Sequence, residues 1–174
     1  GLLNNINVIC EKPLVLTLKS LDNLKKIQKK SKKKVNCILQ LRLHKETKRL
    51  KKLKNKIKNI DITYISPRGN WYFESWKGNE KKSGGIETNI GIHLFDLLYY
   101  IFGAYDEIKV FHRNKITTSG FFRFGNTKVR WFLSINKINL NLINSNYKNI
   151  REFKVNGKKI DFSNSFNDLH TESY

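Results

Sequence analysis

The chain has 174 residues, with 34 Lys and Arg against 14 Asp and Glu, which gives a formal net charge of +20. This length suits one domain of ordinary size or parts of two, and an apolar content of 39% excludes a wholly disordered chain. A membrane-spanning helix is excluded, because no stretch approaches the roughly 18 apolar residues that it needs.

The first 44 residues predict a βαβ unit. Residues 6–10 are a short apolar run rich in β-branched side chains, which is typical of a buried strand. From Thr17, apolar side chains recur at helical spacing and indicate an amphipathic helix, with Thr17 or Ser20 as the candidate N-cap. Residues 35–44 then alternate apolar and polar side chains, which predicts a second strand. Two strands joined through a helix imply a parallel sheet.

The middle of the chain predicts a helix, a strand and a long loop. Residues 47–60 have the apolar spacing of a second Lys-rich helix, and residues 61–66 read as a strand that Pro67 ends. The following segment, as far as Gly85, is dense in aromatic side chains and glycine, which predicts a loop.

The last part of the chain predicts one helix followed by an antiparallel sheet. Thr88 or Asn89 marks the start of the helix, and Gly103 ends it. Two hairpin turns, FGNT and NGKK, connect strands. The predicted strands cover residues 107–113, 117–124, 128–135, 149–155 and 158–163. The fold class is therefore α/β, with a βαβ unit leading into an α+β part whose mostly antiparallel sheet packs against helices.

The positive charge is concentrated in residues 25–58, which hold 16 basic side chains and one acidic one. Such a patch is expected of a nucleic-acid-binding module. However, 27 Lys outnumber 7 Arg, and Arg makes the bidentate contacts that phosphate and guanine recognition favour. The chain also has 21 Asn and 19 Ile, and A/T-rich codons specify Lys, Asn and Ile together. We therefore favour coding bias and solvated helix faces over a nucleic-acid partner.

Glu11-Lys12-Pro13 follows the first predicted strand directly. Open α/β sheets bind ligands beyond the carboxyl ends of their parallel strands, so these residues are candidates for a binding site. A solvated Lys at the end of a strand is the simpler alternative.

A second group of candidates lies at the start of the predicted long helix. The glycine pair Gly84-Gly85 allows backbone conformations that other residues avoid. Asn89 and His93 are four residues apart, so their side chains point the same way. The positive end of the helix disfavours an imidazolium, and a neutral imidazole can act as a general base. An ionised Asp96 carboxylate close to His93 would instead favour the imidazolium. The alternative interpretation of His93 is a histidine that packs against the sheet.

The aromatic loop supplies both cations and flat rings. Arg68 and Lys77 suit a phosphate or a carboxylate, and Trp71 and Tyr72 offer faces for a base or a sugar. Packing of the domain by these aromatic side chains is the alternative.

Neither a metal nor a disulfide is expected. The His and Cys residues never adopt zinc-ligand spacing, so we predict no metal site. Two isolated cysteines, Cys10 and Cys37, make no disulfide framework, which favours a reducing compartment.

Taken together, the motifs resemble the Gfo/Idh/MocA family of oxidoreductases. In that family, EKP ends a Rossmann strand, and a glycine pair leads into a D-x-G-x-H-x-x-D helix. Here the helix motif is Asn89-x-Gly91-x-His93-x-x-Asp96. The resemblance implies that residues 1–44 are the C-terminal remnant of an NAD-binding Rossmann domain. Residues 45–174 then form a substrate and oligomerisation domain that is truncated at its C-terminus.

The aromatic loop, Asn89 in place of the usual Asp, and the closing segment SFNDLHTESY resemble one bacterial branch of this family. That branch oxidises the sugar 3-hydroxyl of UDP-N-acetylglucosaminuronic acid for lipopolysaccharide O-antigen. The resemblance implies an NAD cofactor, a UDP-sugar substrate, a homo-oligomer built through the sheet, and a cytoplasmic location. Since no G-x-G-x-x-G turn is present, we expect an internal fragment that is inactive alone. The alternatives are a nucleic-acid-binding module and a catalytically dead oligomerisation remnant.

The resemblance also implies roles for individual residues. Lys12 contacts the nicotinamide ribose and the reacting hydroxyl, and His93 takes the hydroxyl proton. Glu11 and Pro13 complete the cofactor contacts. The remaining substrate contacts are assigned to Thr88 and Asn89 at the helix and to Arg68 and Lys77 in the loop.

Overall fold

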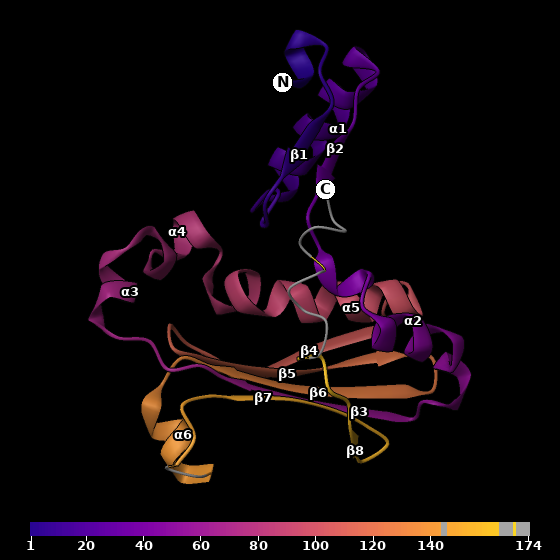
Figure 1. The fold of residues 1–174 in the computed structure, drawn as a ribbon. Helices are drawn as coiled ribbons and strands as arrows, with labels where there is room; N and C mark the ends of the chain where they lie inside the picture. Colours follow the sequence, from indigo (N-terminus) through magenta and orange to yellow (C-terminus); the bar gives the residue numbers. More distant parts are fainter. Residues whose placement is uncertain (144–145, 164–168, 170–174) are drawn as a thin grey trace.

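The computed structural model describes residues 1–143, 146–163 and 169 (Figure 1). It contains two sheets, a parallel pair of strands near the N-terminus and a six-stranded sheet in the order β4-β5-β6-β3-β7-β8. Figure 1 shows the small unit standing away from the large sheet. The closing segment SFNDLHTESY lies mostly outside the described residues.

The predicted βαβ unit is confirmed. Strands β1 (Val8–Cys10) and β2 (Val35–Cys37) pair in parallel, and α1 (Leu18–Ser31) connects them. The hydroxyl of Thr17 accepts a hydrogen bond from the Ser20 backbone N–H at 3.1 Å, so Thr17 is the N-cap. No side chain of α1 is fully buried.

Two predicted elements end earlier than their sequence patterns suggested. The strand predicted over residues 35–44 stops at Cys37, and a 3₁₀ turn, η2 (Gln40–Arg42), follows it. The alternation was misleading because Leu41 turns away to join the large core, where it is 8% exposed. The helix predicted over residues 47–60 is α2 (Lys45–Lys52) with a further 3₁₀ turn, η3 (Lys54–Lys56).

The large sheet follows the predicted strands closely. Five of its strands lie within about two residues of the predicted bounds, and only the last is much shorter than predicted. Strands β3 and β6 pair in parallel, and every other pairing is antiparallel. The strands are β3 (Asn59–Ile65), β4 (Glu107–Arg113), β5 (Thr117–Phe124), β6 (Thr127–Ser134), β7 (Ile150–Val155) and β8 (Lys158–Lys159). A short helix, α6 (Lys137–Ile143), was not predicted.

Helix α5 (Ile92–Phe102) covers one face of this sheet, and α6 lies on the other side (Figure 1). Leu97 and Leu98 of α5 are fully buried in the main core against the apolar side chains of the sheet. Gly91 allows the close approach, since a Cβ there would lie 2.8 Å from the Leu133 side chain. Gly103, with φ at 90°, ends the helix as predicted.

The predicted aromatic loop contains three short helical segments. These are α3 (Asn70–Glu74), η4 (Trp76–Gly78) and α4 (Glu80–Ser83). A π-helical turn, η5 (Glu87–Gly91), then leads directly into α5. Ile86 already has helical backbone angles, so the long helix begins before the predicted Thr88 or Asn89. Among the described residues, no helix is both long and apolar enough to cross a membrane.

Candidate active site

A cavity of about 580 Å³ lies between α5, the aromatic segment and strands β3, β7 and β8. It brings together residues from the two motifs and the aromatic segment, which are distant in the sequence. Five of the eight predicted site residues line it, and they are Lys12, Arg68, Lys77, Asn89 and His93.

The other three predicted residues do not line this cavity. Glu11 and Pro13 flank Lys12 in the chain but are not among the residues that line the cavity. Thr88 lines a second, mainly apolar cavity of about 450 Å³ on the other side of η5. Thr88 and its neighbour Asn89 therefore line different cavities.

Lys12 links the two motifs directly. Its Nζ donates a hydrogen bond of 2.6 Å to the backbone carbonyl oxygen of Asn89. Burial of the ammonium lowers the pKa of Lys12, and the nearby charge of Lys77 lowers this pKa further, against a smaller opposing effect of Glu11. Lys12 is therefore a partly buried cation beside the cavity, which differs from the solvated Lys of the alternative interpretation.

Asn89 is held through its side chain as well as its backbone. Its Nδ2 donates a hydrogen bond of 3.1 Å to the hydroxyl of Tyr72, which is only 3% exposed. Asn89 lies within the π turn, and π turns inside α-helices are frequent at functional sites. The position of this amide is therefore set by two elements, η5 and α3.

Asn89 and His93 both line the cavity, as their spacing predicted. The argument about the charge of His93 needs correction, because the helix begins earlier than predicted. The effect of a helix terminus falls off within the first turn, and His93 lies beyond it. The argument from the helix terminus therefore does not apply to His93.

Asp96 interacts with Arg42, an interaction that sequence reasoning missed. The Arg42 Nε donates to Asp96 Oδ2 at 2.7 Å, and its Nη2 donates to Oδ1. The hydrogen bonds to Asp96 raise the pKa of Arg42. Asp96 thus holds η2 against α5, and its carboxylate is engaged by this guanidinium.

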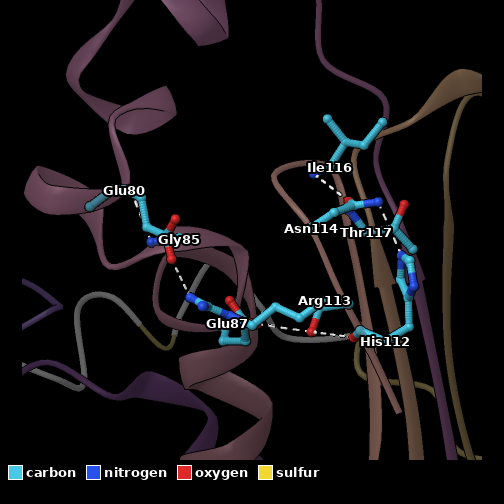
Figure 2. A network of polar contacts seen from close by, with 10 residues as sticks. Glu80, Gly85, Glu87, His112, Arg113, Asn114, Ile116 and Thr117 are labelled. Atoms are coloured by element: carbon cyan, nitrogen blue, oxygen red, sulfur yellow. Dashed lines mark hydrogen bonds and ion pairs between the residues drawn. The ribbon is translucent and has the colours of Figure 1, made fainter. Parts of the chain in front are cut away.

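The glycine pair forms the turn before the helix, as predicted. Gly84 and Gly85 have φ values of 75° and 79°, in the region that favours glycine. A Cβ at Gly84 would lie 2.6 Å from the Thr88 hydroxyl oxygen. Figure 2 shows Arg113 reaching from β4 toward this turn. Its Nε donates to Glu87 at 2.9 Å, which ties the turn to the sheet.

The sheet contributes cavity residues for which the sequence had no signal. Arg151 and Lys159 line the cavity from β7 and β8. The Arg151 guanidinium lies 5.3 Å from the ring centroid of Tyr64, which is its partner across the sheet. Alternation along a strand predicts that a side chain faces one side, but it does not indicate that this side faces a cavity.

The aromatic segment places its cations beside the cavity. The Arg68 guanidinium and the Lys77 ammonium lie 6.0 and 5.9 Å from the ring centroid of Trp71. Trp71 is 52% exposed, whereas Tyr72 is buried. Tyr72 therefore packs the domain, whereas Trp71 faces outward beside two cations, and the binding role of this segment stays a prediction.

Among the described residues, no group of three or more His, Cys, Asp or Glu side chains is placed to hold a metal ion. Cys10 and Cys37 are free thiols on paired positions of β1 and β2. At the cavity itself, Lys12 offers a cation, Asn89 a hydrogen-bonding amide and His93 an imidazole.

Comparison with known proteins places these features in context. Residues 55–174 match the model of the C-terminal alpha/beta domain of an oxidoreductase family, Gfo/Idh/MocA. Two solved structures of the WlbA (WbpB) dehydrogenase from Thermus thermophilus are 38% identical to this chain, with TM-scores of 0.87 and 0.86. One holds NAD and alpha-ketoglutarate, and the other holds NAD and UDP-GlcNAcA.

These two matches cover 98% of this chain but only 57% of the Thermus thermophilus protein. An inositol dehydrogenase homolog from Azotobacter vinelandii, solved with NAD+, is 14% identical and has a TM-score of 0.68. That match covers 88% of this chain and 44% of the homolog, and at this identity it shows the common fold alone.

Proposed function

The chain belongs to the Gfo/Idh/MocA family of oxidoreductases, and from this premise we propose that it is part of an NAD-dependent sugar-nucleotide dehydrogenase. The proposed substrate is a UDP-N-acetylhexosaminuronic acid, oxidised at its 3-hydroxyl, in the synthesis of lipopolysaccharide O-antigen sugars. The observation that carries the proposal is the hydrogen bond between Lys12 and the Asn89 carbonyl, which joins the two family motifs at one cavity. The similarity to a dehydrogenase solved with UDP-GlcNAcA supports the choice of substrate.

The roles of the residues follow from their positions at the cavity. NAD, when bound, supplies the hydride acceptor. Lys12 orients the reacting hydroxyl as a hydrogen-bond donor. Its pKa is lowered mainly because its ammonium is partly buried. His93 accepts the hydroxyl proton. Asn89 cannot ionise, so it contributes hydrogen bonding and leaves the proton transfer to His93.

Lys12 also suits a cofactor on structural grounds. It follows β1 at the carboxyl edge of a parallel pair of strands, where dinucleotides bind in open α/β sheets. Glu11 and Pro13 flank it at that edge. None of the ten glycines of the chain forms a G-x-G-x-x-G turn. We therefore assign the dinucleotide pyrophosphate to residues outside this chain, and residues 1–44 and 45–174 to separate cofactor and substrate parts.

Arg68 and Lys77 are assigned to the substrate carboxylate or diphosphate, since both are cations at the cavity. Thr88 receives no substrate contact in this proposal, because its side chain lines the second cavity. The free thiols agree with a cytoplasmic location.

We also propose a homo-oligomer built through the large sheet. Its edge strand β4 exposes apolar side chains, among them Val110 at 52% and Phe111 at 66% exposure. Light scattering of the purified chain tests this, and a monomer at every concentration would contradict it.

Calorimetry tests the proposed substrate directly. The chain is titrated with UDP-N-acetylglucosaminuronic acid and, as a control, with UDP-N-acetylglucosamine, which lacks the carboxylate. Tighter binding of the acid is expected, because the cavity holds several cations. Equal affinity for both sugars would contradict the assignment of the carboxylate. The absence of binding by either would favour the catalytically dead remnant.

A further inference from the structure

We propose that Tyr72 is a positioning residue that orients the side-chain amide of Asn89, so that Oδ1 accepts a hydrogen bond from a substrate hydroxyl. The inference rests on the proposed function for the identity of the substrate. The orientation itself rests on the hydrogen bond of 3.1 Å from Asn89 Nδ2 to the Tyr72 hydroxyl.

Tyr72 is well suited to hold another side chain in place. It is 3% exposed, and its ring packs edge-to-face against Trp71 and Phe73, with centroid distances of 5.9 and 5.5 Å. Because the Tyr72 side chain is itself buried, its ring is held in place and its hydroxyl occupies one position. Tyr72 therefore offers a rigid partner to an amide that would otherwise rotate.

The backbone of Asn89 is fixed from the other side. Lys12 donates to its carbonyl oxygen at 2.6 Å, and the π turn η5 continues directly into α5. With the backbone held, the remaining freedom of Asn89 lies in its side-chain torsions. The bond to Tyr72 removes that freedom.

The chemistry of an amide makes this orientation important. An Asn side chain has one oxygen acceptor and one NH2 donor, whereas a carboxylate has two acceptor oxygens. Since the NH2 of Asn89 faces Tyr72, the oxygen is left for the cavity that Asn89 lines. A hydroxyl donor on the substrate matches that oxygen, and a carboxylate at this position would present an acceptor in either orientation.

Calorimetry with UDP-N-acetylglucosaminuronic acid tests this inference in a double-mutant cycle. Tyr72→Phe keeps the ring and its packing but removes the hydroxyl, and we expect the affinity to fall about 3- to 10-fold, the scale of one hydrogen bond. In an Asn89→Asp background, the same substitution should change the affinity less than about twofold, because both carboxylate oxygens accept. Tyr147→Phe, at an exposed tyrosine away from the cavity, is the matched control and should leave the affinity unchanged.

An equal loss of affinity in both backgrounds would indicate a merely structural role for Tyr72 and would overturn the inference. No loss in the Asn89 background would overturn it as well.

A second measurement needs no ligand. The side-chain amide resonances of Asn89 are identified by NMR from their disappearance in Asn89→Asp. They should shift in Tyr72→Phe and stay in place in Tyr147→Phe. Unchanged resonances in Tyr72→Phe would overturn the orientation whatever the ligand does. If the wild-type chain binds no UDP-sugar, the proposed function fails and the substrate contact fails with it, while the resonances still decide the orientation.

Discussion

The ammonium of Lys12 donates a hydrogen bond of 2.6 Å to the backbone carbonyl of Asn89, 77 positions further along the chain. This bond joins the small βαβ unit to the start of the helix that covers the large sheet. Because both residues line one cavity, a single contact connects the edge proposed for the cofactor with the site proposed for the sugar.

Removal of either Lys12 or His93 should abolish most turnover. In an enzyme that combines this chain with a dinucleotide-binding part, Lys12→Ala and His93→Ala should each lower kcat at least about 10²-fold, the scale expected for loss of an orienting group and of a general base. His112→Ala, at an exposed histidine on β4, is the matched control and should stay near the wild-type rate. A wild-type kcat in His93→Ala would rule out the proton transfer proposed for this residue.

The pKa of Lys12 should respond to its charged neighbours with predictable sign. The charge of Lys77 lowers this pKa and that of Glu11 raises it, so Lys77→Gln should raise the pKa and Glu11→Gln should lower it further. Both changes can be followed by NMR titration of reductively ¹³C-methylated lysines, with the Lys12 signal identified by its loss in Lys12→Ala. Lys25→Gln, which removes a distant exposed charge, should leave the signal in place. An unchanged Lys12 pKa in Lys77→Gln would show that burial alone accounts for the lowered value.

The chain alone should bind NAD very weakly. Its sequence lacks the glycine-rich turn that holds a dinucleotide pyrophosphate, although Lys12 and its neighbours supply the edge of a parallel sheet. Calorimetric titration of the 174-residue chain with NAD checks this expectation. Micromolar binding would refute it and would require a pyrophosphate site within these residues.

The ion pair between Arg42 and Asp96 should stabilise the fold. The Asp96 side chain is only 11% exposed, so Arg42→Ala would leave a largely buried carboxylate without its guanidinium. We expect a loss of about 1–2 kcal/mol in the free energy of unfolding, reduced from the buried value because Arg42 itself is partly exposed. Urea denaturation measures this loss.

The matched control for the ion pair is Arg130→Ala, which removes the exposed partner of Asp61. An exposed pair should contribute only about 0–1 kcal/mol. Equal losses in the two variants would show that the burial of Asp96 does not strengthen its pair.

The lysines of residues 25–58 should give only charge-driven binding to nucleic acid. Binding to duplex DNA is expected to weaken steeply with salt, as any strongly basic patch does. Fluorescence titrations against duplexes of different sequence should give equal affinities at each salt concentration. A preference for one sequence would favour the nucleic-acid-binding alternative.

Local patterns were sufficient for most of the fold. Along β6 buried side chains alternate with more exposed ones over most of the strand, and this period of two appears directly in its sequence. The predicted bounds were wrong where a residue packs into the large core and not against its neighbours in the chain. Leu41 continues the alternation begun at Val35, yet it leaves the small sheet and packs against the large core.

The sequence by itself determined the two motifs and the residues in them, because Glu11-Lys12-Pro13 and the glycine-led helix are recognisable from residue type and spacing. It also indicated that Asn89 and His93 share a side of their helix, since that depends only on local geometry. Only the tertiary structure decided that Lys12 meets Asn89, that Arg42 engages Asp96, and that Arg151 reaches the same cavity. These contacts join segments more than 50 residues apart, and no local period carries information about such pairings. They form when the burial of apolar faces brings the helix onto the sheet.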